Sequence, residues 1–313
     1  MNQLLLTVGN IYIDHNIFGV NAGDEFRLES GKDYFANSGS ERVLGGSAMN
    51  VAMQARRLGA EVCFVGKTGA DSGAKEVREL LSVQGIISDL VSEDATQATS
   101  MAVNLIGKDG EFIGVHYGEA SRTLALEDID LNHDLFERCN GIYFGGTGKQ
   151  PLLFSKCAEL FSKLTSRGIK VFYDPNRFPA HEALADRSLL HDQLAFAEGY
   201  FPNEGELLQA TEKTDVNEAL DEVVGTGVKF VALKLGAKGC RIKTQTEDFT
   251  VEAKQVRAIS TVGAGDCFNA TFIVYYLQGA SLKECAERAT TAAAIKVSQN
   301  TWPDQATIEN YSR

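Results

Sequence analysis

Hydrophobic residues along the chain gather in short continuous runs that alternate with segments of helical spacing. The runs predicted to form strands are residues 4–9, 61–66, 141–144, 169–174, 200–201 and 228–233. Uninterrupted apolar runs are typical of strands that are buried on both faces of a parallel sheet. The segments between them place apolar residues three and four positions apart, as helices do. The pattern therefore predicts an α/β fold, with a mostly parallel central sheet flanked by helices on both faces.

Shorter signals refine this outline. Residues 86–91 are expected to form a short strand, residues 152–164 a helix, and residues 239–253 strands near a sheet edge. The last helix is predicted to begin at Ser281, because Ser281 and Glu284 have the spacing of a capping box.

Two segments are predicted to lie outside the main sheet. Residues 15–43 lack helical spacing, and residues 98–118 have the pattern of a hairpin with its turn at residues 108–110. We expect both segments to join in one small sheet. No linker or internal repeat divides the rest, so the prediction is one domain over residues 1–313, with strands inserted at about residues 12–43 and 98–118.

Composition narrows the classes of function. The 313 residues carry a formal net charge of −12, which argues against nucleic acid or an anionic membrane surface as a partner. The chain does not open with a basic region followed by a long apolar run, so we expect no targeting or membrane-spanning segment. Its cysteines form no CxxC pair, and its histidines show no metal-ligand spacing. We expect a cytoplasmic protein with reduced cysteines and no transition-metal site.

The main candidate site is the glycine-rich start of a predicted helix. Gly263, Ala264 and Gly265 leave backbone N–H groups free at the helix N-terminus, where the helix dipole also favours an anion. Asp266 follows directly, and a carboxylate there is placed to take a proton from an attacking hydroxyl. The alternative is a glycine-rich turn with Asp266 as an ordinary first-turn residue.

A second glycine-rich helix start lies near the N-terminal end. Gly45 and Gly46 permit a close approach between the backbone and a ligand, and Asn50 offers a donor and an acceptor to a hydroxyl-rich molecule. Asp14 follows the first strand, at the edge where ligands bind in parallel sheets. The alternatives are a plain helix start and a turn aspartate.

A third candidate is an acidic helix start after the strand at residues 200–201. Asn203 and Glu206 are predicted to hold Mg²⁺ through water, because Mg²⁺ keeps several of its waters in protein sites. The alternative is a capped helix with acids in its first turn. An anion site with a base, a hydroxyl-binding set and a magnesium site together meet the requirements of phosphoryl transfer to a hydroxyl.

Three other classes lack their motifs. Residues 145–150 differ from a P-loop. When Gly148 and Lys149 are aligned with that motif, its first glycine falls at Tyr143, and Gln150 follows the lysine where serine or threonine is required. No GxGxxG follows the first strand, and no GxSxG elbow is present, so the common dinucleotide and hydrolase folds are not supported.

Taken together, the motifs resemble those of ribokinase-like carbohydrate kinases, the PfkB family, nearly from end to end. The segments that carry the resemblance are residues 45–52, 66–73, 203–206, 234–239 and 261–266. The resemblance implies a ribokinase-like fold and ATP-dependent phosphorylation of a sugar or sugar-acid hydroxyl. The strands inserted outside the main sheet would be the family's lid, which often also forms a homodimer interface. Closure of the lid would exclude water from the site.

The resemblance also assigns roles to individual residues. Asp266 would be the general base, and residues 263–265 would form the anion hole for the moving phosphoryl group. The sugar ligands would be Asp14, Gly45, Gly46 and Asn50. The residues bordering the nucleotide would be Lys234, Gly236, Gly239 and Asn203, and Mg²⁺ would be held by Glu206 and Asn203.

The chain also departs from the family pattern. Ser260 stands where many members have an aspartate that, in ribokinases, helps to hold a monovalent cation, so the resemblance does not carry that cation over to this chain. Residues 174–177 approach the D-x-N-x-R pattern of fructokinases and 2-keto-3-deoxygluconate kinases, with the arginine one residue early. Two alternatives remain: a nucleoside kinase on the same fold, and a non-catalytic sugar-binding regulator.

Overall fold

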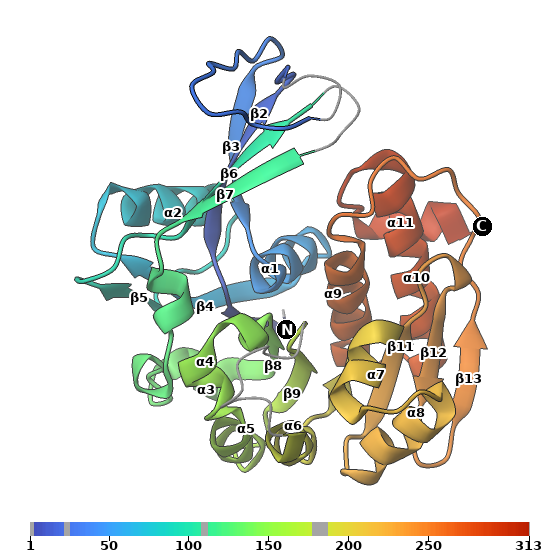
Figure 1. The fold of residues 1–313 in the computed structure, drawn as a ribbon. Coiled ribbons are helices and arrows are strands. Elements are labelled where there is room, and N and C mark those ends of the chain that lie inside the picture. Colours follow the sequence, from blue (N-terminus) through green and yellow to red (C-terminus); the bar gives the residue numbers. More distant parts are fainter. Residues whose placement is uncertain (1–2, 22–25, 108–111, 177–186, 313) are drawn as a thin grey trace.

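The computed structural model describes residues 3–21, 26–107, 112–176 and 187–312 (Figure 1). Within them, nine strands form one sheet in the order β13-β12-β11-β10-β9-β8-β1-β4-β5. The strands are β1 (Leu4–Gly9), β4 (Glu61–Gly69), β5 (Val91–Asp94), β8 (Cys139–Gly145), β9 (Lys170–Asp174), β10 (Gly199–Tyr200), β11 (Phe230–Lys234), β12 (Cys240–Lys243) and β13 (Asp248–Val251). The antiparallel pairs in this sheet are β11–β12 and β12–β13, at one edge, so the predicted mostly parallel sheet is confirmed.

Helices cover both faces of this sheet, as the apolar runs predicted. One face is covered by α1 (Ser47–Arg57), α2 (Ser72–Val83), α9 (Ala264–Leu277), α10 (Leu282–Gln299) and α11 (Gln305–Ser312). The other is covered by α3 (Asp134–Arg138), α4 (Pro151–Phe154), α5 (Cys157–Thr165), α6 (Arg187–Leu194), α7 (Glu204–Thr211) and α8 (Val216–Gly225).

Two hydrophobic cores follow from this arrangement, because successive side chains of a strand point to opposite faces. In β1, Leu5 belongs to the core under α1 and α9, whereas Leu4 and Leu6 belong to the core under α5 and α8. All six residues of β1 are buried, which explains why its sequence is apolar without alternation.

A separate four-stranded sheet projects from the top of the molecule in Figure 1. Its order is β3-β2-β6-β7, formed by β2 (Tyr12–Phe18), β3 (Ser40–Gly45), β6 (Met101–Ile106) and β7 (Phe112–Tyr117). Strands β6 and β7 pair antiparallel, as the hairpin pattern predicted, and the two inserted segments do share one sheet. The predicted turn at residues 108–110 lies outside the described residues.

Two local predictions were wrong. The strand expected at residues 86–91 begins only at Val91, and of the preceding residues only Ile87 makes an isolated bridge. The helix expected at residues 152–164 is divided into α4 and α5 between Phe154 and Cys157. The backbone N–H groups of Ser155 and Lys156 bond to carbonyls of α4 and close its end. The capping box at Ser281 is confirmed, but α11 follows α10 and was not anticipated.

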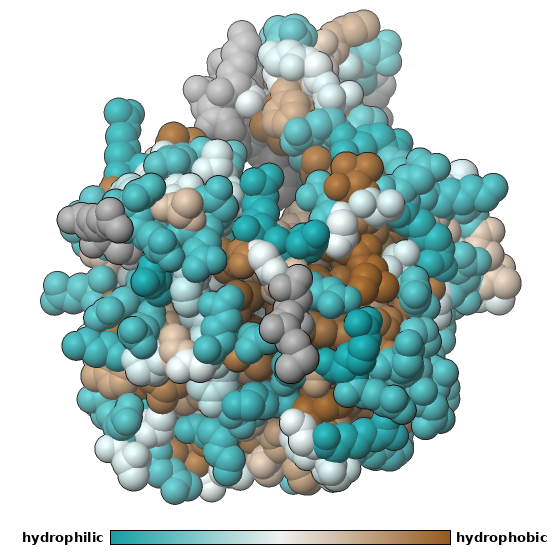
Figure 2. Space-filling model, turned by 180° about the vertical axis from the view of Figure 1, so that it is seen from behind, coloured by the Kyte–Doolittle hydropathy of each residue, from teal (hydrophilic) through white to brown (hydrophobic). Residues whose placement is uncertain are grey.

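Three general observations concern the surface, the helices and the cysteines. Figure 2 shows hydrophilic residues over much of the rear face and hydrophobic residues gathered toward its middle, below the projecting sheet. Among the described helices, none combines the length and the apolar composition that crossing a bilayer demands. All six cysteines are free and buried.

Candidate active site

The candidate site lies where the parallel strands end and α9 begins. Gly263 caps α9 in the left-handed region, with φ of 74°, which glycine adopts without strain. A Cβ at Gly263 would also approach the Trp302 ring to 3.0 Å. The first turn of α9 therefore presents the backbone of residues 263–265 with no side-chain cap on its N–H groups, as an anion site requires.

The structure brings the two glycine-rich helix starts together at Asp266. Its carboxylate accepts hydrogen bonds from Ser47 Oγ at 2.7 Å and from Asn50 Nδ2 at 2.8 Å, both on α1. Gly46 caps α1 with φ of 110°, and a Cβ there would lie 2.3 Å from the carbonyl oxygen of Asn10. Glycine is therefore required for α1 to start this close to the end of β1.

Opposing effects act on the ionisation of Asp266. Burial raises the pKa of its carboxyl group above the ordinary value, while the hydrogen bonds from Asn50 and Ser47 lower it. The charge of Asp174 raises the pKa of Asp266 more weakly, and the charge of Lys234 lowers it more weakly. The result is a carboxylate with a raised pKa at the mouth of a helix, as expected for a group that accepts a proton.

Asp14 and Gly45 form a second pair, on neighbouring strands of the small sheet. Asp14 lies on β2 and Gly45 ends β3. A Cβ at Gly45 would overlap the Asp14 carboxylate, at 2.0 Å from Oδ2, so the glycine makes room for that carboxylate. Burial raises the pKa of Asp14 to about 6.

A buried ion pair lies beside the start of α9. Lys234 Nζ at the end of β11 donates to Asp174 Oδ2 at the end of β9, at 2.6 Å, and only 15% and 3% of their side chains are exposed. Asn269 Nδ2 donates to the same Asp174 oxygen at 2.7 Å. The Lys234 ammonium also lies 3.7 Å from the position of a Cβ on Gly265, so this cation borders the predicted anion site.

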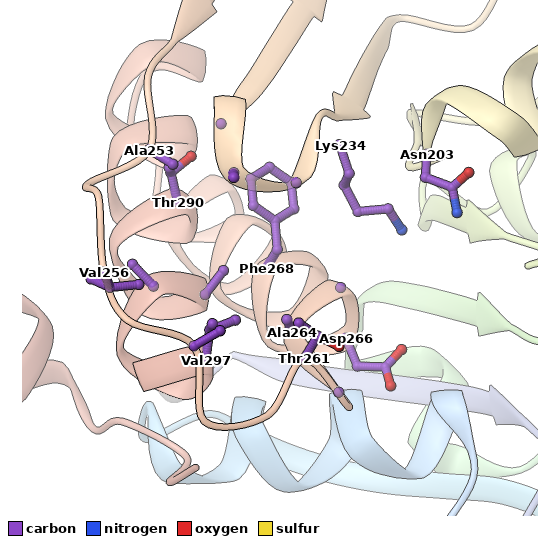
Figure 3. A pocket seen from close by; sticks show the side chains of 18 of the residues that line it. Asn203, Lys234, Ala253, Val256, Thr261, Ala264, Asp266, Phe268, Thr290 and Val297 are labelled. Atoms are coloured by element: carbon purple, nitrogen blue, oxygen red, sulfur yellow. The ribbon is translucent and has the colours of Figure 1, made fainter. Parts of the chain in front are cut away.

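A cavity of about 500 Å³ opens beside these residues (Figure 3). It is lined by the predicted nucleotide residues Asn203, Lys234, Gly236 and Gly239, by Glu206, and by residues 263–266. Figure 3 shows Asn203, Lys234 and Asp266 on one side of the cavity and Val256, Thr290 and Val297 on the other. The cavity therefore has a polar wall and a more apolar wall.

The two glycines in the β11–β12 connection differ in their surroundings. A Cβ on Gly236 would meet nothing within 4 Å, so the backbone there is open to a ligand. A Cβ on Gly239 would lie 2.0 Å from the carbonyl oxygen of Val251, so Gly239 is required by the packing of β13.

Asn203 and Glu206 form the capping box of α7. Asn203 Oδ1 accepts from the Glu206 backbone N–H at 2.9 Å, and Glu206 Oε2 accepts from the Asn203 backbone N–H at 2.8 Å. The helix start that the sequence offered as an alternative is therefore present. Burial, and then the charge of Asp174, raise the pKa of Glu206. Within the described residues, no group of three or more His, Cys, Asp or Glu side chains is placed to hold a metal ion.

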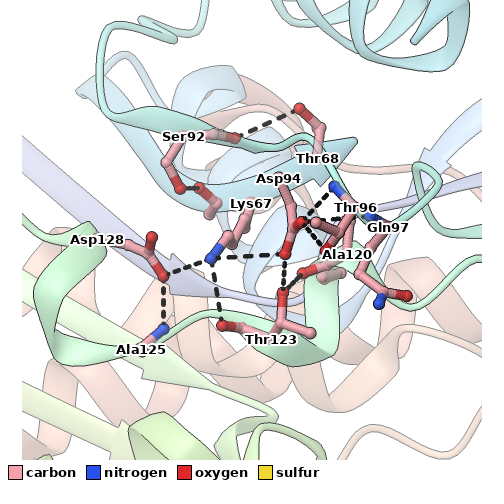
Figure 4. A network of polar contacts seen from close by, with 12 residues as sticks. Lys67, Thr68, Ser92, Asp94, Thr96, Gln97, Ala120, Thr123, Ala125 and Asp128 are labelled. Atoms are coloured by element: carbon pink, nitrogen blue, oxygen red, sulfur yellow. Dashed lines mark hydrogen bonds and ion pairs between the residues drawn. The ribbon is translucent and has the colours of Figure 1, made fainter. Parts of the chain in front are cut away.

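A polar network holds the chain segment that leads to Asp14 (Figure 4). Lys67 Nζ on β4 contacts Asp128 Oδ2 at 3.0 Å, and Thr123 Oγ1 donates to Asp94 Oδ2 at 3.0 Å. These contacts fix the short 3₁₀ helix Ala120–Thr123. Its Ser121 Oγ accepts from the Ile11 backbone N–H at 2.9 Å, directly between β1 and β2.

Comparison with known proteins places the chain in a family. Residues 4–301 match the model described as pfkB family carbohydrate kinase. The chain belongs to this family. It is therefore an enzyme, a phosphotransferase with an alcohol group as acceptor.

Relatives and solved structures agree with this assignment. The 2-dehydro-3-deoxygluconokinase of Bacillus subtilis is 29% identical over 81% of this chain and 80% of its own. A fructokinase of Solanum tuberosum is 28% identical over 72% and 68%. The structure of Arabidopsis thaliana ribokinase complexed with ribose and ATP, 22% identical, covers 100% of this chain and 99% of its own with a TM-score of 0.79, which shows the ribokinase-like fold.

Three residues of the site were not singled out from the sequence as site residues. Ser47 follows the glycine pair, and Asn269 lies three residues after Asp266, so both share a helix face with a predicted residue. Asp174 ends a predicted strand in an acid, a position where ligands commonly bind in parallel sheets. The predicted sugar residues do not line the cavity; Asn50 reaches it only through Asp266.

Proposed function

We propose that the enzyme transfers the γ-phosphoryl group of ATP to a hydroxyl of a sugar or sugar acid. The observation that carries the proposal is the position of Asp266, which borders the cavity and is bonded to Ser47 and Asn50 of α1. One carboxylate thus adjoins both the predicted phosphate site and the predicted sugar site.

In the proposed reaction, Asp266 accepts the proton of the acceptor hydroxyl. The hydroxyl oxygen forms a bond to the γ-phosphorus, the bond from that phosphorus to the β,γ-bridging oxygen breaks, and ADP leaves. The backbone N–H groups of residues 263–265 and the Lys234 ammonium stabilise the charge on the transferred group. Because these groups are already fixed, little reorganisation is required.

The sugar is proposed to bind between the small sheet and the start of α1. Asp14 accepts hydrogen bonds from its hydroxyls, and the backbones of Gly45 and Gly46 permit its close approach. Asn50 orients the acceptor hydroxyl beside Asp266. A sugar bound there lies next to the predicted base, which supports direct proton transfer.

The nucleotide is proposed to occupy the cavity. The apolar wall, which includes Val256 and Val297, suits the base, and the polar wall with Asn203 and Lys234 suits the phosphates. Gly236 offers an open backbone to the nucleotide. Gly239 packs against Val251 and is proposed to hold the β11–β12 connection in place.

Mg²⁺ is proposed to be held through water by Glu206 and Asn203. Glu206 Oε1 is not used by the capping box, and carboxylate oxygen is a ligand that Mg²⁺ prefers. When bound, the ion would neutralise charge on the phosphates. The nearby Asp174 and the raised pKa of Glu206 support a place for a cation here.

We propose that residues 1–313 form one domain with the four-stranded sheet as its lid. Val115 and Tyr117 on the edge strand β7 are 53% and 66% exposed. Exposed apolar side chains on an unpaired edge favour burial against a second copy of the chain, hence a homodimer through the lid. The six free buried cysteines suit a reducing compartment, so we propose the cytoplasm.

The function is tested by ADP release from MgATP with a panel of sugars, sugar acids and nucleosides. The panel includes 2-dehydro-3-deoxygluconate and fructose, the substrates of the relatives named above. We expect turnover with at least one sugar or sugar acid. Turnover with nucleosides alone would contradict the sugar site. Thermal stabilisation by several sugars without turnover would instead support a sugar-binding regulator.

A further inference from the structure

Lys296 on α10 is a buried lysine that has no acidic partner among the described residues. Only 5% of the surface of this residue is exposed. Its Nζ donates to Asn300 Oδ1 at 2.8 Å and lies 5.0 Å from the centre of the Trp302 ring. No described carboxylate forms an ion pair with it, whereas Lys234 is neutralised by Asp174.

This lysine packs behind the first turn of α9. A Cβ on Gly263 would lie 3.6 Å from Lys296 Cε and 3.0 Å from the Trp302 ring. Residues 263–265 line the cavity, and so does Val297, but Lys296 does not. The end of the Lys296 side chain is therefore next to the predicted anion site but does not line the cavity.

The position is unfavourable for a cation in the absence of an anion. A buried ammonium without a counter-ion costs free energy. Contact with Trp302 and Asn300 offsets part of that cost, as does the negative end of α10, in whose last turn Lys296 lies. The N-terminus of a helix also carries partial positive charge, which repels a neighbouring cation. Burial lowers the pKa of Lys296 for the same reason.

We propose that Lys296 is a positioning residue whose fixed positive charge strengthens the anion site of residues 263–265. The phosphates of ATP supply the counter-charge for this ammonium when they enter the cavity. Trp302 and Asn300 hold the ammonium in place. Gly263, which caps α9, packs against Trp302 and Lys296 and so connects them to the first turn of α9. The inference rests on the proposed kinase function, because the anion is the triphosphate of the donor.

Two variants remove the effect in different ways. Lys296→Met keeps the length of the side chain and removes its charge. Asn300→Asp keeps the lysine and places a carboxylate beside its ammonium; aspartate tolerates the left-handed conformation of residue 300, where φ is 51°. Arg288→Met is the matched control, because Arg288 is also on α10 and lies over an aromatic ring, that of Tyr275.

The readout is the affinity for MgATP and for adenosine, measured by calorimetry, together with the melting temperature. We expect MgATP to bind about tenfold more weakly to Lys296→Met and to Asn300→Asp, as loss of one nearby charge predicts. Adenosine, which has no phosphate, should bind equally well to the wild type, to both variants and to the control. A merely structural role would weaken both ligands together.

The outcomes are separable from the fate of the proposed function. Unchanged MgATP affinity in both variants would overturn the role of Lys296. If Lys296→Met does not fold, Asn300→Asp alone decides the question in the same way. Because the readout is binding, it remains valid even if no acceptor gives turnover, which would count against the kinase proposal and not against Lys296.

Discussion

Asp14 and Asp266 are carboxyl groups whose pKa values are both raised by burial, but their hydrogen bonds differ. Asp266 receives two hydrogen bonds that favour its charged form. For Asp14, burial is the cause of a pKa raised to about 6. Asp14 should therefore be sensitive to pH near neutrality, and the two hydrogen bonds to Asp266 orient its carboxylate.

The affinity for the sugar is predicted to rise with pH through about 6. Above that pKa, Asp14 is ionised and accepts hydrogen bonds from sugar hydroxyls with both oxygens; below it, the carboxyl group is protonated. In Asp14→Asn, the KM for the sugar should be raised and lose this dependence. A wild-type KM that is flat across this pH range would contradict the role of Asp14.

The same variant should gain stability. Because the folded-state pKa is raised above the unfolded value of 3.8, ionised Asp14 destabilises the fold increasingly as pH rises from about 4 to 6, and fully above that. Asp14→Asn should raise the free energy of unfolding at pH 8 by ~1 kcal/mol, less than two pKa units give for a fully buried group, because water screens part of the carboxylate. Urea unfolding at pH 4 and pH 8 measures the difference; an equal effect at both values would argue against it.

Gly45→Ala should displace the Asp14 carboxylate, because the added methyl group would overlap it. We expect the KM for the sugar to rise by about tenfold or more, with a smaller change in kcat, as loss of a ground-state contact predicts. Gly225→Ala is a suitable control, since its Cβ would meet nothing within 4 Å. Unchanged kinetics in Gly45→Ala would place the sugar elsewhere.

Among the elements, the ends of β9 and β11 are joined by the Asp174–Lys234 pair. Removing one partner of a buried pair leaves an uncompensated charge, so Asp174→Asn should lower the free energy of unfolding by about 3–5 kcal/mol. Asp248→Asn, at a more exposed pair with Arg241, should cost less than about 1 kcal/mol. Chemical denaturation compares the two, and equal losses would mean that the buried pair is not special.

Local signals explain what the sequence could predict. Glycine before a helical pattern marks both helix starts, and alternation marks the small sheet, so the starts of α1 and α9 and the strands β2 and β6 were predicted correctly. The roles of Gly46 and Asp266 in the site stay predictions. The spacing of Asn203 and Glu206 is the same for a capping box and for a magnesium site. The capping box is present, and the magnesium site stays a prediction.

Long-range contacts explain what it could not. Asp174 and Lys234 meet because β10 alone separates β9 from β11, and strand order is not written in either strand. The division between α4 and α5 falls at Ser155 and Lys156, which are neither glycine nor proline and so gave no signal. The buried position of Lys296 depends on α10 packing against the start of α9.

At the scale of the whole molecule, the four-stranded sheet is proposed to act as a lid over the site and to form a homodimer interface. If β7 forms a homodimer interface, Tyr117→Glu should turn a dimer into a monomer in light scattering after size exclusion, because it places a charge in a buried contact. Val83→Glu is the control, since Val83 is 80% exposed on α2. A wild-type monomer, or equal effects of both variants, would rule out this interface.

Asp266 is the base on which the proposed transfer depends. Single-turnover transfer from MgATP to the acceptor sugar should be slower in Asp266→Asn by about 10²–10⁴-fold, with ATP affinity retained, as the usual effect of losing a general base predicts. Ser47→Ala, which removes one of its hydrogen bonds and keeps the carboxylate, should cost about tenfold at most. A transfer rate near that of the wild type in Asp266→Asn would contradict the account.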